Sequence, residues 1–433
     1  MDGYPFNRVI VRVIYLTWGE TPRASGVYGS QVVAQLDAIQ RELVGGELML
    51  VAGLPLIHSG LVRERLAYPA ELREIRRRLP KVPFRLLWLP AVQTFVYARN
   101  WQMRFLLTSG LSRFAKIVRV FSPDIVHCRS YLAALVALRT REATGIDFKV
   151  VFDARGLWPE EGVIKGRYAE NSDSFRHWKD VEQALLSKAD VTVAVSDPMK
   201  AYYETLGVAR CERIYLSAPT SILGGRDREG GEKVKKNGQG NVLCYVGALA
   251  SGTWHKPETL FDLYRVFRTR LDEPRLLIVS QSNRREILAY ARRMLGDSVL
   301  NEIEFETSAS TDKLAELMAR ADFGALPYMV PHSECEMRVA NTVLAIKTTE
   351  YLAAGLPLIV NRHCGGAAEF IRQHGLGVIY DPADIESSLT REAIAEANTK
   401  PVRQRAQAMA EDLFDYQKNA ARYIELYHAV CRR

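Results

Sequence analysis

Short apolar runs alternate along the whole chain with amphipathic stretches of helical periodicity. This alternation is typical of α/β layers built on parallel sheets. We predict strands at 9–16, 48–52, 125–128, 150–153 and 191–195 in the first half, and at 242–247, 276–280, 303–306, 323–326, 356–360 and 377–380 in the second half. That number of strands fits two doubly wound sheets, whose ligands bind at the carboxyl ends of the strands.

The 433 residues exceed what one core supports, because single cores stop growing near roughly 250 to 300 residues. Residues 224–240 hold six glycines, eight charged residues and one aliphatic side chain, which predicts a linker or a mobile loop. We therefore predict an N-terminal domain at 1–223 and a C-terminal domain at 241–411. Residues 412–433 are predicted to form a helix that packs back on the first domain.

The composition is that of a globular protein, with 48% hydrophobic and 25% charged residues. No apolar run approaches the roughly 18 residues that a membrane-spanning helix needs, and the N-terminus lacks the features of a secretory signal. We expect a cytoplasmic protein. Its six cysteines are scattered without a CxxC pair, which favours reduced thiols over disulfides or zinc.

The net charge of +8 is unevenly distributed along the chain. Residues 61–120 carry 13 Lys and Arg against three Glu, interleaved with aromatic and aliphatic side chains. Such a block suits a peripheral surface that rests on anionic lipid at the inner face of a membrane. A solvated basic face is the alternative, and nucleic acid is the least favoured partner.

The segment 341–360, NTVLAIKTTEYLAAGLPLIV, predicts a helix that begins at Asn341 or Thr342 and is ended by Gly355. Lys347 and Glu350 are three residues apart and share one face of that helix. A cation and a carboxylate near a helix start suit a diphosphate and a ribose, respectively. A surface ion pair is the alternative from spacing alone.

Several motifs resemble family 4 glycosyltransferases. KTTEYLAAGLPLIV, GGAAEFI and GLGVIYDP are similar to the donor-binding region of that family, and ADFGALPY, VEQALLSKADVTVAVS, PDIVHC and VVFDARGLWPEE are similar to further family segments. The resemblance covers most of the chain. It implies the retaining GT-B architecture, in which two Rossmann-like domains face each other across a cleft.

The resemblance also implies site residues. Glu350 is similar to the second glutamate of the family's paired motif, which holds the donor ribose, and Lys347 matches a subgroup with a K-x-x-E-Y motif. The expected catalytic residues are His127, Lys256 and Lys347; the expected donor-binding residues are Gly26, Gly29, Arg155, Gly247, Lys256, Lys347, Glu350 and Glu369.

Each of the weaker candidates has a structural alternative. Gly26 and Gly29 could form an ordinary turn and helix start, and His127 could be a hydrogen-bonded core histidine. Arg155 could pair with a neighbouring carboxylate instead of a phosphate or an acidic acceptor. Glu369 could favour a helix start through the helix dipole alone.

Two positions depart from the family pattern. Thr342 stands where the first glutamate of the motif would lie, and Ala248 stands where relatives have an arginine that grips the diphosphate. Lys256 is the remaining cation of that segment, and Arg338 could compensate from another loop.

No Asp-x-Asp pair stands at a strand end, and the resemblance implies transfer without a metal or other cofactor. The predicted function is transfer of a hexose or N-acetylhexosamine from a nucleotide diphosphate sugar, with UDP as the expected nucleotide. The expected acceptor is a glycan or a lipid-linked glycan of cell-envelope polysaccharide biosynthesis. The alternatives are a nucleotide-sugar epimerase and a non-catalytic nucleotide-sugar-binding subunit.

Overall fold

The computed structural model describes residues 11–57, 68–92, 107–225, 241–250 and 254–432. The chain divides into two compact units. Unit 1 comprises Met1–Ile214 and Asn419–Arg433, and unit 2 comprises Tyr215–Lys418. Each unit is built around its own parallel sheet, as the alternation of apolar and amphipathic segments predicts.

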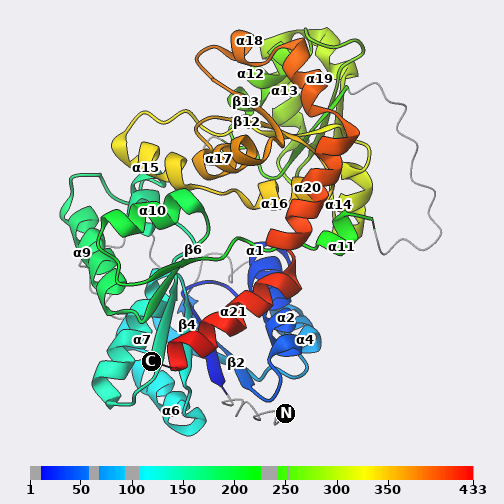
Figure 1. Ribbon diagram of the computed structural model, residues 1–433. Helices are drawn as coiled ribbons and strands as arrows, with labels where there is room; N and C mark the ends of the chain where they lie inside the picture. Colours follow the sequence, from blue (N-terminus) through cyan, green and yellow to red (C-terminus); the bar gives the residue numbers. More distant parts are fainter. Residues whose placement is uncertain (1–10, 58–67, 93–106, 226–240, 251–253, 433) are drawn as a thin grey trace, which may run out of the picture. The chain divides into compact units, whose positions relative to one another are not determined.

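Unit 1 contains a seven-stranded sheet in the order β3-β2-β1-β4-β5-β6-β7. Figure 1 labels β2, β4 and β6 of this sheet. Every neighbouring pair of strands is parallel. The strands are β1 Arg12–Trp18, β2 Glu47–Ile57, β3 Phe84–Val92, β4 Ile125–Arg129, β5 Lys149–Asp153, β6 Val191–Ala194 and β7 Cys211–Arg213. The central strands are almost wholly buried, which explains why they appear in the sequence as continuous apolar runs.

The helices of unit 1 connect these parallel strands, as crossover connections require. They are α1 Gly26–Tyr28, the π-helical η1 Gly29–Ala34, α2 Gln35–Glu42, α4 Tyr68–Arg78, α6 Leu111–Phe121, α7 Ser130–Thr144, α8 Trp158–Ile164, α9 Asp173–Lys188 and α10 Asp197–Thr205. The last helix, α21 Tyr416–Cys431, begins in unit 2 and continues into unit 1. Its Tyr427 hydroxyl lies 2.7 Å from Nδ1 of His127 on β4, so α21 packs against this sheet.

Unit 2 contains a six-stranded parallel sheet in the order β10-β9-β8-β11-β12-β13. Its strands are β8 Val242–Val246, β9 Arg275–Val279, β10 Ile303–Glu306, β11 Phe323–Leu326, β12 Leu358–Asn361 and β13 Gly377–Tyr380. Its helices are α11 Thr220–Leu223, α12 Pro257–Phe267, α13 Arg284–Leu295, the 3-10 helix η2 Asp297–Asn301, α14 Thr311–Met318, α15 Glu334–Thr342, α16 Ile346–Ala353, α17 Gly365–His374, α18 Ile385–Ser388, α19 Arg391–Ala397 and α20 Lys400–Leu413. The main core packs α12 and α13 against this sheet.

The predicted strands correspond to eleven of the thirteen observed ones, and β3 and β7 were missed. β3 lies inside the basic block at 61–120, although its own sequence, FRLLWLPAV, holds a single cation, Arg85. It was missed because the whole block was interpreted as a surface. It is an edge strand, with Phe84 and Leu89 buried and Trp88 37% exposed. Part of the block's aromatic content therefore belongs to the core. Residues 61–67 and 93–106 of the block lie outside the described residues.

The predicted helix at 341–355 is wrong at its start. Asn341 and Thr342 close α15, and α16 begins only after Ala345, with extended backbone between the two helices. The predicted end is confirmed, since Gly355 follows α16 with a φ of +72°. Near the C-terminus, the helix predicted at 412–433 corresponds to α21, which begins at Tyr416, just after α20 ends at Leu413.

Around the predicted domain boundary, residues 226–240 of the proposed linker lie outside the described residues. The segment just before them belongs to unit 2. The N–H of Ala218 donates to the carbonyl of Phe414, and the Thr220 hydroxyl donates to Asp415 at 2.6 Å. Across the part of the chain that the structure describes, no helix has the length and apolar character needed to cross a bilayer.

Candidate functional site

The carboxyl edge of the unit 2 sheet brings together the end of β8 and the start of α16. Tyr351 of α16 is fully buried, and its hydroxyl accepts a hydrogen bond of 2.7 Å from the N–H of Val246. This contact fixes α16 against β8. Lys347 and Glu350 lie three residues apart on the same helix, as predicted.

The Lys347 side chain lies directly over Gly247. A Cβ at position 247 would clash with Cε and Nζ of Lys347, and Gly247 has a φ of +128°. The backbone conformation favours glycine here, and a side chain would also displace the end of Lys347. The ammonium lies 5.7 Å from the centroid of the Tyr245 ring. Gly247 and Lys347, both predicted as donor-binding residues, thus lie in contact.

Lys347 and Glu350 do not form the ion pair that spacing alone suggested. Neither charged group makes a hydrogen bond or an ion pair with another described residue, although both side chains are half-buried. Burial lowers the pKa of Lys347, and the nearby Glu350 partly offsets this. Burial raises the pKa of Glu350 to about 7, opposed by the charge of Lys347. Such unsatisfied, perturbed groups are typical of ligand sites.

The start of α17 lies beside the start of α16. The buried thiol of Cys364, which precedes α17, interacts with the backbone of Ala345 and with the charge of Lys347. Burial raises the pKa of this thiol to about 12, so it is neutral. The first turn of α17 has neither a side-chain cap nor an acidic residue. Two uncapped helix starts and a lysine thus form an anion-binding arrangement.

Lys256 and His255 precede α12 on the same side of the sheet. His255 is buried against the rings of Tyr245 and Tyr328. Its pKa is lowered first by burial and then by the charge of Lys347, so the segment lies near that lysine. The Lys256 ammonium is half-buried and has no hydrogen bond or ion pair to a described residue. It therefore remains available for a ligand.

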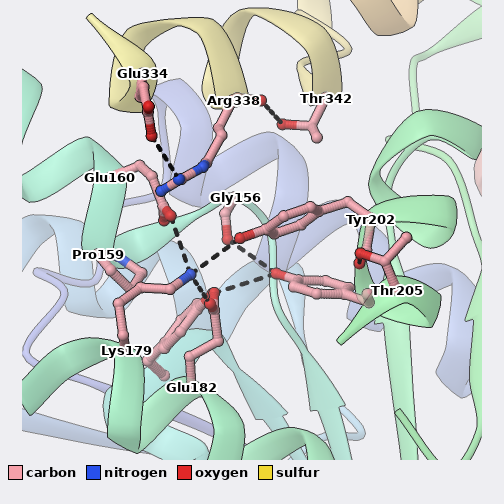
Figure 2. A network of polar contacts seen from close by, with 12 residues as sticks. Gly156, Pro159, Glu160, Lys179, Glu182, Tyr202, Thr205, Glu334, Arg338 and Thr342 are labelled. Carbon is pink, nitrogen blue, oxygen red and sulfur yellow. Dashed lines mark hydrogen bonds and ion pairs between the residues drawn. The ribbon is translucent and has the colours of Figure 1, made fainter. Parts of the chain in front are cut away.

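The positions that depart from the family pattern contribute no charge to this edge. Figure 2 shows the Thr342 hydroxyl donating back to the Arg338 carbonyl of its own helix, at 3.0 Å. Arg338 is paired with Glu334 at 3.0 Å. At the position of the missing arginine, the Ala248 carbonyl accepts a hydrogen bond from Tyr245.

Glu369 lies in the second turn of α17, so its predicted place at a helix start is wrong. Its carboxylate pairs with Arg372 and accepts a hydrogen bond of 2.6 Å from Gln373, both on the same helix. These local contacts give Glu369 a structural role in the ligand-free protein.

In unit 1, Gly26 and Gly29 begin the helical stretch after β1. Gly26 has a φ of +62° and open space around it. Gly29 is needed for packing, because a Cβ there would clash with the carbonyl of Ala24. The stretch continues as a π-helical turn, a feature that is frequent at functional sites.

His127 is fully buried, and both ring nitrogens have partners. Nδ1 lies 2.7 Å from the Tyr427 hydroxyl, and Nε2 lies 3.3 Å from Oδ2 of Asp153. Burial lowers the pKa of His127, partly offset by Asp153. This arrangement matches the core-histidine alternative. Arg155 likewise pairs with Asp153, with Nε 2.8 Å from the same oxygen.

Sequence reasoning missed a buried ionic network behind the loop that carries Arg155. Figure 2 shows Lys179 of α9 between the carboxylates of Glu160 and Glu182, and its ammonium also contacts the Tyr202 hydroxyl at 3.0 Å. The Tyr203 hydroxyl donates to the carbonyl of Gly156 at 3.4 Å. These contacts hold the loop between β5 and α8. Their only sequence signal is a lysine three residues before a glutamate, which is too common to be informative.

The candidate residues therefore form two groups. In unit 2, Gly247, Lys347 and Glu350 lie together, and Lys256 directly follows His255, whose pKa is lowered by the charge of Lys347. The other group, in unit 1, contains His127 and Arg155, and Arg155 reaches the helix after Gly29 through the carbonyl of Gln31 at 3.5 Å. Among the described residues, no three His, Cys, Asp or Glu side chains are grouped as a metal site would need.

Two family descriptions match the chain. Residues 20–217 match "Glycosyl transferase 4-like domain", and residues 240–396 match "Glycosyl transferases group 1". No curated protein matches.

Several solved structures are similar to this chain over nearly its whole length. Sucrose-phosphate synthase from Thermosynechococcus elongatus is 18% identical, with a TM-score of 0.62 over 97% of this chain and 99% of its own. Anabaena HepE in complex with UDP is 14% identical, with a TM-score of 0.64 over 97% and 100%. A putative UDP-N-acetylglucosamine 2-epimerase from Listeria monocytogenes is 12% identical, with a TM-score of 0.53 over 96% and 95%. At these identities the similarity concerns the fold alone.

Proposed function

Because this chain is a glycosyltransferase of the family 4 type with the GT-B fold, we propose that it transfers a hexose or N-acetylhexosamine from a nucleotide diphosphate sugar, with retention of configuration. The proposed acceptor is a glycan or a lipid-linked glycan of cell-envelope polysaccharide biosynthesis. UDP is the proposed nucleotide, a choice supported by the similarity to HepE, which was solved with UDP.

The observation that carries this proposal is the unpaired Lys347 ammonium at the end of β8, beside the starts of α16 and α17. A diphosphate supplies the negative charge that these groups lack. Lys256, which has no ionic partner among the described residues, is the proposed second cation for the same ligand. The Glu350 carboxylate, three residues further along α16, would accept hydrogen bonds from the ribose hydroxyls.

In the proposed glycosyl transfer, the protein stabilises the charge of the leaving group. The bond from the anomeric carbon to the phosphate oxygen breaks, and a bond to the acceptor oxygen forms on the same face of the sugar. The departing phosphate oxygen takes the acceptor proton. Lys347 and Lys256 stabilise the negative charge that develops on this leaving group, in place of a metal ion. We assign His127 a positioning role, since both its nitrogens are occupied.

The direct test is calorimetric titration of the protein with UDP-glucose, UDP-N-acetylglucosamine, GDP-mannose and ADP-glucose, without any acceptor. We expect saturable binding of one nucleotide class, with UDP itself competing if the uridine assignment is correct. Binding of none of these donors would contradict the proposal and favour a non-catalytic role. Conversion of a bound donor to its epimer without an acceptor would favour the epimerase alternative.

We further propose that the basic surface of unit 1 rests on anionic lipid. Helix α4 exposes Arg73 and Arg76, and the Arg76 guanidinium lies 5.9 Å from the ring of Phe84 on β3. Trp88, further along β3, is partly exposed. Cations beside an exposed tryptophan suit a lipid headgroup layer.

Flotation with vesicles tests this surface. The protein should float with phosphatidylcholine vesicles that contain phosphatidylglycerol, and salt should reduce the effect because the attraction is electrostatic. Replacement of Arg73 and Arg76 with glutamine should abolish flotation. Absence of flotation with the anionic vesicles would show that the surface is merely solvated, and equal recovery with pure phosphatidylcholine vesicles would contradict an electrostatic attraction.

A further inference from the structure

Polar side chains are concentrated on one face of the unit 1 sheet, where three neighbouring strands end. Thr17 of β1, Arg129 of β4 and Asp153 of β5 lie side by side in register, and Tyr15 lies two residues before Thr17 on the same face. All four are buried. Ligands of doubly wound sheets bind at this edge.

The backbone after two of these strands is strained. Ser130 directly follows β4 with a φ of 68°, and Arg155 follows β5 with a φ of 64°. Left-handed backbone at residues other than glycine costs about 1 to 2 kcal/mol each and is concentrated at functional sites. The Lys179 network and the Tyr203 contact hold the second of these turns in place.

Arg129 has one strong contact and one unsatisfied nitrogen. Its side chain is 8% exposed, Nε lies 3.0 Å from the Glu20 carboxylate, and Nη1 is buried without a hydrogen bond to any described residue. Arg129 also precedes α7, a helix of 15 residues whose start has no side-chain cap. A buried guanidinium nitrogen without a hydrogen bond lowers the stability of the folded protein. At a helix start, such a nitrogen is well placed to bind an anion.

Arg155 adds a second positive charge to this place. Its guanidinium is 12% exposed and lies close enough to Arg129 for the two charges to repel each other. Asp153 pairs directly with Arg155, through an oxygen that also contacts His127. Its charge acts on Arg129 less strongly than that of Glu20, so Glu20 is the main counter-charge of Arg129.

The Glu20 carboxylate can be displaced from Arg129 more easily than the buried groups around it. Its side chain is 36% exposed, in contrast to the buried groups around it, and it follows Gly19, which has a φ of +77°. In the ligand-free protein, the Glu20 carboxylate thus occupies the position that an external anion would take on Arg129.

We propose that unit 1 recognises its acceptor through an anionic group, a phosphate or a carboxylate, which binds Arg129 and Arg155 and displaces Glu20. This inference rests on the proposed glycosyl transfer and names the chemical class of the acceptor. Bidentate contact with a planar guanidinium suits both anions.

The test uses protein saturated with UDP, so that the anion site of unit 2 is filled. Inorganic phosphate, glucuronate and neutral glucose are titrated separately, and binding is followed by tryptophan fluorescence and by thermal shift. We expect phosphate or glucuronate to bind and glucose to have no effect. The bound anion distinguishes a phosphorylated acceptor from a uronic acid.

Substitutions test whether the anion binds at Arg129 and Arg155. Arg129→Gln and Arg155→Gln should each lower the affinity for the anion by about tenfold or more. Glu20→Gln should raise this affinity several-fold, because the competing carboxylate is replaced by a neutral amide. Arg12→Gln is the matched control: Arg12 starts β1 at the opposite edge of the sheet and pairs with Glu47, so this variant should bind as the wild type does.

Two outcomes would overturn the inference: no anion binding to the UDP-saturated protein, or unchanged affinity in Glu20→Gln. Glu20 is partly exposed, so its replacement should not prevent folding. If neither UDP nor any of the four nucleotide sugars binds, the proposed function fails, and titration of the nucleotide-free protein and these variants still tests the arginine site.

Discussion

Replacing Lys347 with methionine is expected to weaken UDP binding by about tenfold or more and to slow the release of UDP from the nucleotide sugar by about 10²-fold. Methionine keeps most of the apolar stem that lies over Gly247 but removes the charge. Because the ammonium has no ionic partner in the described residues, its loss breaks no ion pair within the protein. The effect should therefore fall on binding and rate, with folding retained.

Lys313→Met is the matched control. Lys313 lies on α14 of the same unit and pairs at the surface with Glu316. This control should change neither UDP affinity, measured by calorimetry, nor the rate of UDP release. If Lys347→Met bound UDP as tightly as the wild type, the diphosphate would have to bind elsewhere.

Glu350→Gln is expected to weaken donor binding by about tenfold or more at alkaline pH, because the ribose hydroxyls lose a charged acceptor. The pKa of Glu350 in the free protein is raised to about 7 by burial. The carboxylate therefore becomes ionised as the pH rises through about 7. Wild-type affinity for the donor should rise over the same interval, and the affinity of the variant should lack this rise.

The same substitution should stabilise the protein. The pKa of Glu350 is higher in the folded protein than in the unfolded chain, where it is about 4.5. The contribution of Glu350 to the free energy of unfolding is therefore complete below about pH 4.5, and it is lost as the pH rises through about 7. Glutamine mimics the protonated form, so the gain should be absent near pH 4.5 and present above about pH 7. After allowance for solvent screening, the gain is on the order of 1 kcal/mol, or about 2 to 4 °C in Tm.

Thermal melts and donor titrations at matched pH values check both effects. Glu350→Asp serves as the comparison, since it keeps the charge but shortens the reach. A variant that melts earlier than the wild type above about pH 7, or that binds donor with unchanged pH dependence, would contradict the assignment of this carboxylate.

The two-sheet architecture could be predicted from the sequence because parallel strands are buried on both faces and appear as continuous apolar runs. β3 and β7 escaped prediction for different reasons. β3 is a largely apolar edge strand inside a block that was interpreted as a basic surface, and β7 has only three residues. The start of α16 was misplaced because helix-favouring residues continue from α15 across a break that tertiary packing imposes.

Local spacing and family resemblance identified Lys347, Glu350 and Gly247, since these residues follow recognisable motifs at strand and helix ends. The sequence could not show that the Glu369 carboxylate forms an ion pair within its own helix. Nor could it show that both ring nitrogens of His127 contact other side chains, those of Asp153 and Tyr427. Tyr427 lies 300 residues from His127. Such pairings depend on which distant segments pack together.

The sequence by itself thus determined the α/β class, the two parallel sheets and the motif that carries a cation and a carboxylate on one helix. Only the tertiary structure decided the protonation behaviour of that pair and the pairing of Arg129 with Glu20. The physical reason is that periodicity and motifs record short-range constraints along the chain. Burial, by contrast, sets the charge state of a side chain, and burial depends on residues that the fold brings from far away.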